Sequence, residues 1–397
     1  MGELKPGWRR VKFGEVVRLG KERCDPVSDG VERYIGLEHI EPCDLRVRSW
    51  GDVSDGTTFT TRVRPGHVLF GKRRAYQRKV AVADFDAVCS GDIYVFESAN
   101  PAKLMPELLP FLCQTDAFFD YAVGTSAGSL SPRTNWTSLA EYEFALPPLA
   151  EQRRIARVLA TATASISATS EAIACGATAR DALLKSLYMG GIRGGRPVSD
   201  TSVGPVPTGW RVDPLGEHFQ VQLGKMMSEN ARGGDGHIPY LRNANVQWNT
   251  LELDDVATMA FSEQEREKFS LRYGDILACE GRHVGKSAMW REEIPGACYQ
   301  KALHRLRAIR DDVPSYLLHC LRYYSITGRF GGATVETTIP HLPAEKLRAM
   351  HFPFPSREEQ VEIADTIDTY DRSLERLRVR YQHASGLLAK LLPSESA

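Results

Sequence analysis

The chain of 397 residues repeats itself with a period near 208 residues. The segment Leu146-Pro147-Pro148-Leu149-Ala150-Glu151-Gln152 returns as Phe354-Pro355-Ser356-Arg357-Glu358-Glu359-Gln360. Upstream, Pro6-Gly7-Trp8-Arg9 returns as Thr208-Gly209-Trp210-Arg211 at an offset of 202. Because the matches keep one order while their offset drifts slowly, they indicate a duplicated unit with small loop insertions. A duplication of this kind predicts two similar folded bodies with two similar binding surfaces.

A long helical pattern follows each copy of the proline-containing segment. Pro147-Pro148 and Pro355 block extension of a helix towards the N-terminus, which predicts helix starts near Glu151 and Arg357. Gly190-Gly191 and Pro393 mark the ends. Each helix would therefore span roughly 36 to 38 residues, or about 55 Å at 1.5 Å per residue.

The apolar residues of both helices recur at alternating spacings of four and three, the pattern of a coiled-coil seam. The first seam is weaker, because Thr169, Gly176 and Arg180 stand at seam positions. Two matched stripes favour pairing of the helices with each other, and the alternative is two unrelated core helices. The predicted seam and partner residues are Ile155, Leu159, Ile166, Ile173 and Leu187 in the first helix and Ile363, Ile367, Leu374, Leu377 and Leu388 in the second.

The remaining chain alternates short apolar strand-like runs with turn residues, and one helix is expected in each copy, over residues 106–123 and 315–326. A stretch rich in Gly, Ser and Pro reads as a linker. The predicted class is a mixed α/β (α+β) fold. The predicted organisation is a globular domain at 1–148, a spacer helix at 149–190, a linker at 191–206, a second domain at 207–355 and a second spacer helix at 356–393.

The charge of the chain is balanced but unevenly distributed. Fifty Lys and Arg residues match fifty Asp and Glu residues, which by itself speaks against nucleic acid as a partner. No acidic residue occurs between Asp55 and Asp84, however, while seven Lys and Arg residues fall there. A charge run is often just a solvated face, but basic residues also occupy the corresponding loop of the second copy.

Guanidinium groups bind phosphates or the guanine edge through two parallel hydrogen bonds, so these loops are candidates for contacts with double-stranded DNA. Each residue could equally be an ordinary surface charge, and Asn243 and Asn245 could equally cap a turn. The candidates are Lys72, Arg73, Arg74, Tyr76 and Arg78 in the first copy and Arg242, Asn243, Asn245, Arg282, His283 and Lys286 in the second.

Catalytic and metal-binding motifs are absent from the sequence. The stretch from Glu280 to Ser287 resembles a phosphate-binding loop, but its required glycine is replaced by Glu280. The eight cysteines show no CxxC spacing and are expected to be free thiols in the cytoplasm. No run of about 18 apolar residues predicts a membrane span.

Over nearly its whole length the chain resembles the specificity (S) subunits of type I restriction–modification systems. The resemblance rests on the order and duplication of the proline-led Glu-Gln segments and long helices, together with three shorter motifs. These are Phe70-Gly71-Lys72-Arg73-Arg74-Ala75-Tyr76, Arg133-Thr134-Asn135-Trp136 and Thr338-Ile339-Pro340-His341-Leu342.

The resemblance implies a non-catalytic subunit with two target recognition domains, each reading one half of a bipartite, asymmetric DNA site. It implies that the two helices pair as an antiparallel coiled coil with pseudo-twofold symmetry and dock methyltransferase (M) subunits, two of them, and indirectly restriction (R) subunits. The chain itself would hold no cofactor: S-adenosylmethionine belongs to the M subunit, and ATP and Mg²⁺ belong to the R subunit. The alternative is a coiled-coil scaffold whose duplicated domains bind protein rather than DNA.

Overall fold

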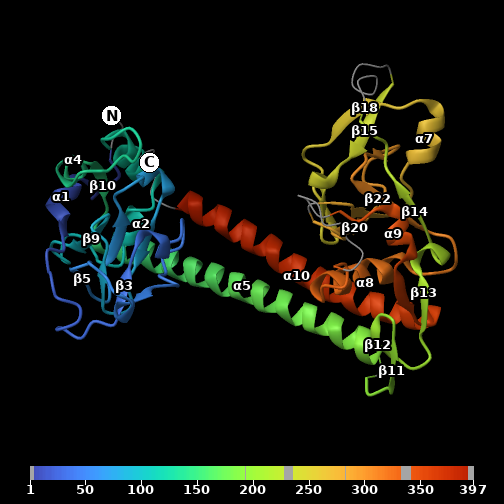
Figure 1. The fold of residues 1–397 in the computed structure, drawn as a ribbon. Helices are drawn as coiled ribbons and strands as arrows, with labels where there is room; N and C mark the ends of the chain where they lie inside the picture. Colours follow the sequence, from blue (N-terminus) through green and yellow to red (C-terminus); the bar gives the residue numbers. More distant parts are fainter. Residues whose placement is uncertain (1–3, 193, 228–235, 282, 332–340, 392–397) are drawn as a thin grey trace. The chain divides into compact units, whose positions relative to one another are not determined.

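The computed structural model describes residues 4–192, 194–227, 236–281, 283–331 and 341–391, with the side chains of 388–391 left out. The chain forms two compact units. Unit 1 comprises residues 1–170 and 379–397, and unit 2 comprises residues 171–378. Both long helices run from one unit into the other, so each unit holds a globular domain and one part of each helix (Figure 1).

The globular part of unit 1 is built on two four-stranded sheets. The antiparallel sheet has the order β2-β9-β6-β7 and comprises β2 (Val17–Leu19), β6 (Val68–Gly71), β7 (Val80–Val82) and β9 (Ile93–Ser98). The second has the order β4-β3-β8-β5, with β3 and β8 parallel, and comprises β3 (Arg33–Ile35), β4 (Gly51–Asp52), β5 (Thr61–Val63) and β8 (Ala87–Cys89). A separate pair joins β1 (Arg9–Lys12) to β10 (Glu143–Leu146). The short helices are α1 (Phe13–Val16), α2 (Leu109–Leu112), α3 (Asp116–Gly124) and α4 (Trp136–Ala140).

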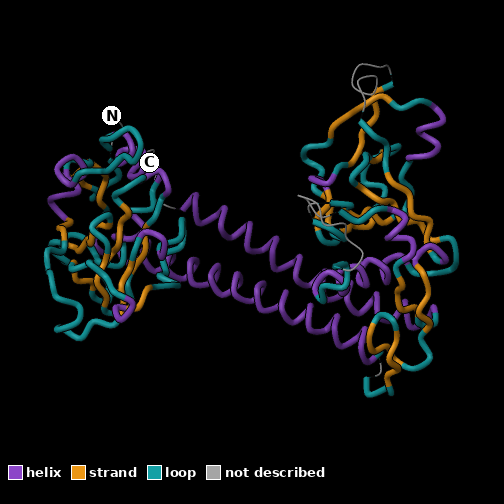
Figure 2. Tube along the Cα trace, in the orientation of Figure 1, coloured by secondary structure: helices purple, strands orange, loops and turns teal. Residues whose placement is uncertain are grey.

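Unit 2 repeats the four-stranded antiparallel sheet in the same strand order, and its second sheet keeps the parallel pair with one strand fewer. Figure 2 shows strands and short helices in both globular parts. The antiparallel sheet of unit 2 has the order β14-β22-β19-β20 and comprises β14 (Phe219–Leu223), β19 (Ile276–Cys279), β20 (Ser287–Met289) and β22 (Leu303–Ala308). A three-stranded sheet again contains one parallel pair, β15 with β21, and comprises β15 (His237–Leu241), β18 (Ala257–Ala260) and β21 (Cys298–Tyr299). Further elements are the pair β13 (Arg211–Pro214) and β23 (His351–Phe354), the hairpin β16 (Val246–Gln247) and β17 (Thr250–Leu251), and the helices α7 (Glu263–Phe269), α8 (Pro314–Ile326) and α9 (Ala344–Ala349). The predicted duplication is confirmed at the level of strand order.

Two local predictions were wrong. The helix expected over residues 106–123 is two helices, because Thr115 interrupts it and accepts a hydrogen bond at Oγ1 from the Phe118 amide, 3.3 Å away, as the N-cap of α3. The linker at 191–206 contains a hairpin of β11 (Val198–Thr201) and β12 (Gly204–Pro207). Its turn uses Gly204 at a φ of +84°, so the residues that suggested an irregular linker are turn residues of a hairpin.

The long helices are α5 (Leu149–Gly190) and α10 (Arg357–Leu391), of 42 and 35 residues. One glutamine fixes the start of each. The buried Gln152 side chain donates to the carbonyls of Lys103 and Pro147 and accepts from the Met105 amide, each at 2.9 Å. Gln360 donates to the Pro355 carbonyl and the Asp312 carboxylate and accepts from the Val313 amide. The glutamine of each repeated Glu-Gln segment therefore anchors the start of a long helix to the residues that precede α2 or α8.

Within unit 2 the helices α5 and α10 pack in antiparallel order. Gly176 faces Leu374 so closely that a Cβ added to the glycine would lie 2.4 Å from Leu374 Cδ2. One turn further along α5, Arg180 forms an ion pair with Asp371 at 3.3 Å. The seam positions that looked weak in the sequence are thus complementary, since the glycine admits the leucine and the arginine meets a carboxylate.

Five of the ten residues predicted for the coiled-coil seam belong to the cores of the two units. Ile155 and Leu159 pack into the core of unit 1, while Leu187, Ile363 and Ile367 are buried in the core of unit 2. The reason is that a core-facing helix and a coiled-coil helix carry the same apolar period. Leu374 is a buried seam residue, and Ile166, Ile173 and Leu377 are half-buried. The side chain of Leu388 lies outside the described residues.

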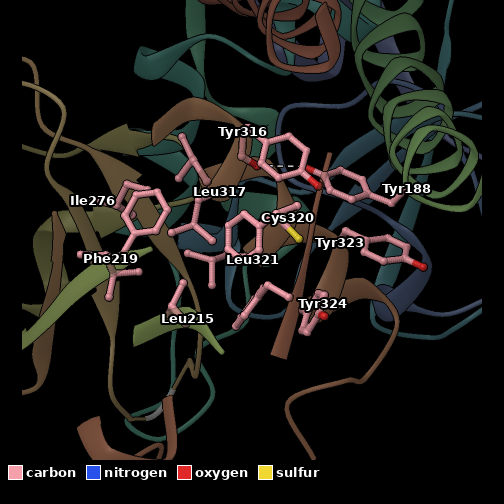
Figure 3. Close-up of a cluster of buried hydrophobic side chains, with 14 of the residues drawn as sticks. Tyr188, Leu215, Phe219, Ile276, Tyr316, Leu317, Cys320, Leu321, Tyr323 and Tyr324 are labelled. Carbon is pink, nitrogen blue, oxygen red and sulfur yellow. Dashed lines mark hydrogen bonds between the residues drawn. The ribbon is translucent and has the colours of Figure 1, made fainter. Parts of the chain in front are cut away.

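The C-terminal end of α5 is fixed in the core of unit 2 by aromatic packing (Figure 3). Tyr188 stacks on Tyr323 with ring centroids 5.0 Å apart, and its hydroxyl donates to the Tyr316 carbonyl at 2.8 Å. Among the described helices, α5 alone is long and apolar enough to cross a membrane by length and composition, with a mean hydropathy of 1.2 in its most apolar 18-residue window. One such helix is weak evidence for a span, and both ends of α5 pack into protein cores.

Candidate nucleic-acid interface

In unit 1 the basic loop is residues 72–79. It connects β6 to β7 at the edge of the antiparallel sheet β2-β9-β6-β7. A single 3₁₀ turn (Ala75–Gln77) shapes it, with Arg74 and Arg78 on either side in the left-handed region at a φ of 55°. Buried Ala75 anchors the turn, so Arg74 and Tyr76 project outwards, and Tyr76 is 56% exposed. Among the described residues neither side chain has a hydrogen-bond partner. They are the two predicted contacts of unit 1 that are most available to a ligand.

Arg73 is held rather than free. Its guanidinium donates to Ser131 Oγ at 2.7 Å and to the Asp92 carboxylate at 3.1 Å. The same carboxylate pairs with Arg133 at 3.0 Å, and Arg73 and Arg133 also form a β-bridge. Two guanidinium groups thus share one acid, which leaves a net positive charge at this bridge. Arg133 was not among the predicted contacts, although its motif was noted, because only the bridge brings it to the loop.

Two other predicted contacts of unit 1 have structural partners. The ammonium group of Lys72 lies 4.5 Å from the centre of the Tyr94 ring, and its burial there lowers the pKa of Lys72. Arg78 donates to the Asp116 carboxylate at 2.6 Å and lies over the Phe119 ring. Arg78 therefore fastens the loop to α3, and its use as a DNA contact would require the Asp116 pair to open.

The equivalent loop of unit 2 connects β19 to β20, as the sequence predicted. His283 is exposed at its tip, and Lys286 donates to Gln247 Oε1 at 2.5 Å. Gly285 has a φ of +77°, and a Cβ there would lie 2.3 Å from the Phe330 ring, so only glycine fits. Arg282 lies outside the described residues.

A second loop lies beside the basic loop in each unit. In unit 2 it is the 3₁₀ turn Asn243–Asn245 after β15, and Asn243 donates to the Gly281 carbonyl of the neighbouring loop at 3.4 Å. In unit 1 it is the turn Leu37–His39 after β3, where Lys79 donates to the Leu37 carbonyl at 2.7 Å. The candidate surface of each unit therefore consists of two adjacent loops, and we call it the two-loop surface. In unit 1 this surface also includes the exposed Glu38, which was not among the residues predicted from the sequence.

The prediction for Asn245 is corrected by the structure. Its side chain is buried, donates to the carbonyls of Glu252 and Asp255 at 2.8 and 3.0 Å, and accepts from the Arg242 amide at 3.0 Å. These bonds occupy the amide, so Asn245 shapes the turn and does not reach a ligand. The Arg242 guanidinium is ion-paired with Asp255. Of the second copy's candidates, Asn243, His283 and Lys286 remain predictions on the two-loop surface.

Comparison with known proteins decides what this surface belongs to. The family model described as the type I restriction modification DNA specificity domain matches twice, at residues 7–174 and 207–380. The chain belongs to this family. As a member of this DNA specificity family it recognises DNA sequence, and the scaffold alternative is not favoured.

Individual relatives agree with the family model. The type I restriction enzyme EcoDI specificity subunit of Escherichia coli is 27% identical over 152 residues, which cover 38% of this chain and 33% of that subunit. A protein named provisionally as the type I restriction enzyme MjaX specificity subunit, from Methanocaldococcus jannaschii, is 21% identical over 94% of this chain and 89% of its own length. The type I restriction–modification S subunit from M. genitalium shares the fold at a TM-score of 0.61 with 15% identity, covering 99% of this chain and 98% of that one.

This specificity-family chain shows no metal-binding cluster of His, Cys, Asp or Glu within the part that the structure describes. Its cysteines are free thiols, five of them buried. The two-loop surface presents arginine, lysine and tyrosine side chains in unit 1 and asparagine, histidine and lysine side chains in unit 2, which are groups that contact phosphates and base edges.

Proposed function

We propose that each globular domain reads one half of a bipartite, asymmetric site in double-stranded DNA. The duplication carries this proposal, because the two domains share strand order and place a basic loop at the same edge of the same sheet. The loops differ in sequence, Lys72-Arg73-Arg74 in one and His283 with Lys286 in the other, so each domain would select different bases. The long helices would act as the spacer, and a change in their length should change the permitted gap between the half-sites.

The chemistry would come from partner subunits in the cytoplasm. In this proposal the exposed faces of α5 and α10 dock two methyltransferase subunits, which bind S-adenosylmethionine, and restriction subunits join through them with ATP and Mg²⁺. The resemblance to specificity subunits and the lack of a catalytic motif in the sequence support this division of labour.

Arg73→Ala tests base reading by unit 1. We expect a loss of about 1–3 kcal/mol in binding that is confined to one half-site, together with relaxed preference at one base position. The measurement is binding of the complex with its methyltransferase subunit to the target and to single-base variants of each half. Arg10→Ala is the matched control, because Arg10 is an exposed arginine on β1 away from both loops. Unchanged affinity and preference in Arg73→Ala, or an equal loss in the control, would remove Arg73 from the reading surface.

A further inference from the structure

Unit 2 contains a polar cavity that lies away from the two-loop surface in the sheet. It has a volume of about 370 Å³ and opens beside the edge strand β14 and the end of α7. The side chains that matter for its chemistry are Gln220 and Gln222 of β14, Arg305 and Arg307 of β22, and Lys268 and Arg272. The cavity is several times larger than the ~30 Å³ that one water molecule occupies in the liquid.

Arg305 forms the floor of this cavity and is 2% exposed. Its guanidinium donates to Gln220 Oε1 at 3.1 Å, to Gln222 Oε1 at 2.6 Å and to the carbonyls of Lys268 and Ser270. All of these acceptors are neutral, and the buried Nε has no acceptor among the described residues. Burial lowers the pKa of Arg305. A buried arginine without a carboxylate partner is costly, which makes the site receptive to an anion.

The surrounding charges do not neutralise Arg305. The nearby Asp275 carboxylate is occupied by Arg307, which binds both of its oxygens at 2.6 Å. Lys268 and Arg272 are exposed on the rim, and Glu267 is the acid among the lining residues. The Arg272 guanidinium has no hydrogen-bond partner in the described part of the chain. The lining therefore carries more positive than negative charge around a buried cation.

Unit 1 provides an internal comparison. The position equivalent to Arg305 is Val95, because β9 pairs with β6 in the register in which β22 pairs with β19. The β2 side of Val95 is met by the backbone of Gly20, whose amide donates to the Val95 carbonyl at 2.8 Å. The equivalent place in unit 1 therefore holds an apolar side chain, and the buried cation is a feature of unit 2.

We propose that the cavity at Arg305 in unit 2 binds a phosphate oxyanion. The ligand chemistry is a tetrahedral, multiply charged oxygen acceptor, which can accept hydrogen bonds from the exposed Arg272 and Lys268 beside the buried charge of Arg305. Two sources share that chemistry, free phosphate and a backbone phosphate of bound DNA. For the second source the inference rests on the proposed DNA-binding function.

The test uses the full chain, titrated with inorganic phosphate at constant ionic strength and followed by calorimetry. We expect one saturable site per chain. Gln222→Glu is the decisive variant, because it places a carboxylate where Gln222 already accepts from Arg305 and so neutralises the buried guanidinium. It should weaken phosphate binding at least tenfold while the chain stays folded. Arg272→Ala should also weaken it, and Lys346→Ala, which removes an exposed charge of α9 outside the cavity, should leave it unchanged.

A second arm measures DNA binding by the complex with its methyltransferase subunit. If the source is a DNA phosphate, Gln222→Glu and Arg272→Ala should weaken binding equally for all sequences and reduce the salt slope by about one. Free phosphate as the source predicts a change in the first arm only. The proposal is overturned if neither variant changes either kind of binding. Absence of DNA binding by the wild-type complex would instead count against the proposed function, and the phosphate arm would still report on the cavity.

Discussion

Leu374→Asp is expected to destabilise unit 2 by about 2–5 kcal/mol or more. Leu374 is buried against Gly176, whose missing side chain makes the space for it. Loss of the leucine packing alone should cost about 2–5 kcal/mol, and a carboxylate in an apolar contact adds a desolvation cost. The melting temperature of unit 2, followed by circular dichroism, should fall by roughly 10 °C. Hydrogen exchange in residues 171–187 and 363–378 should accelerate.

Ser373→Asp is the matched control, because it adds the same charge at the neighbouring, exposed position of α10. It should melt within about 2 °C of the wild-type chain, as most surface substitutions cost less than 0.5 kcal/mol. If both variants lose stability equally, the effect is one of charge on the helix. If Leu374→Asp melts like the wild type, the packing of α5 on α10 contributes nothing to stability.

Gln152→Leu is expected to release the start of α5 from unit 1. The leucine keeps most of the volume of the glutamine, but it leaves the Met105 amide and the carbonyls of Lys103 and Pro147 without a hydrogen-bond partner. Each unsatisfied buried group costs about 1–3 kcal/mol, so a total near 3 kcal/mol is reasonable for groups that partly regain water. The Met105 amide should then exchange with solvent at least tenfold faster.

The second copy supplies the control for this experiment. Gln360→Leu should accelerate exchange of the Val313 amide and leave Met105 unaffected, while Gln152→Leu should do the reverse. Glu151→Gln, one residue away, removes only the exposed ion pair with Arg154 and should change neither amide. If either variant accelerates exchange at both amides, or neither variant changes exchange at all, the glutamines are not local anchors of the helix starts.

The sequence predicted the parts of the fold that depend on local chemistry. Prolines located the helix starts within two residues of Leu149 and at Arg357, because proline removes a backbone donor and clashes with a preceding turn. Short apolar runs between turn residues likewise predicted that the globular parts contain strands. The duplication then predicted the equivalence of the basic loops, which the shared strand order confirms.

What the sequence could not predict depends on partners that are distant in the chain. Gly176 and Arg180 looked like defects because Leu374 and Asp371 lie almost 200 residues away. Arg242 and Arg78 looked like free cations because Asp255 and Asp116 reach them only in the folded domain. Arg133, absent from the predicted contacts, enters the surface only through its bridge to Arg73. In each case the role of the residue was decided by a contact that only the folded chain brings about.

Methylation mapping of the genome tests the central claim most directly, in cells that express this chain with its neighbouring methyltransferase subunit and in cells that lack the chain. The two-domain account predicts a bipartite motif with a modified base in each half, present only when the chain is expressed. Exchange of the globular part of unit 2 for that of a relative should then change one half of the motif and leave the other intact. A motif that does not depend on the chain, or an exchange that alters both halves together, would contradict the account.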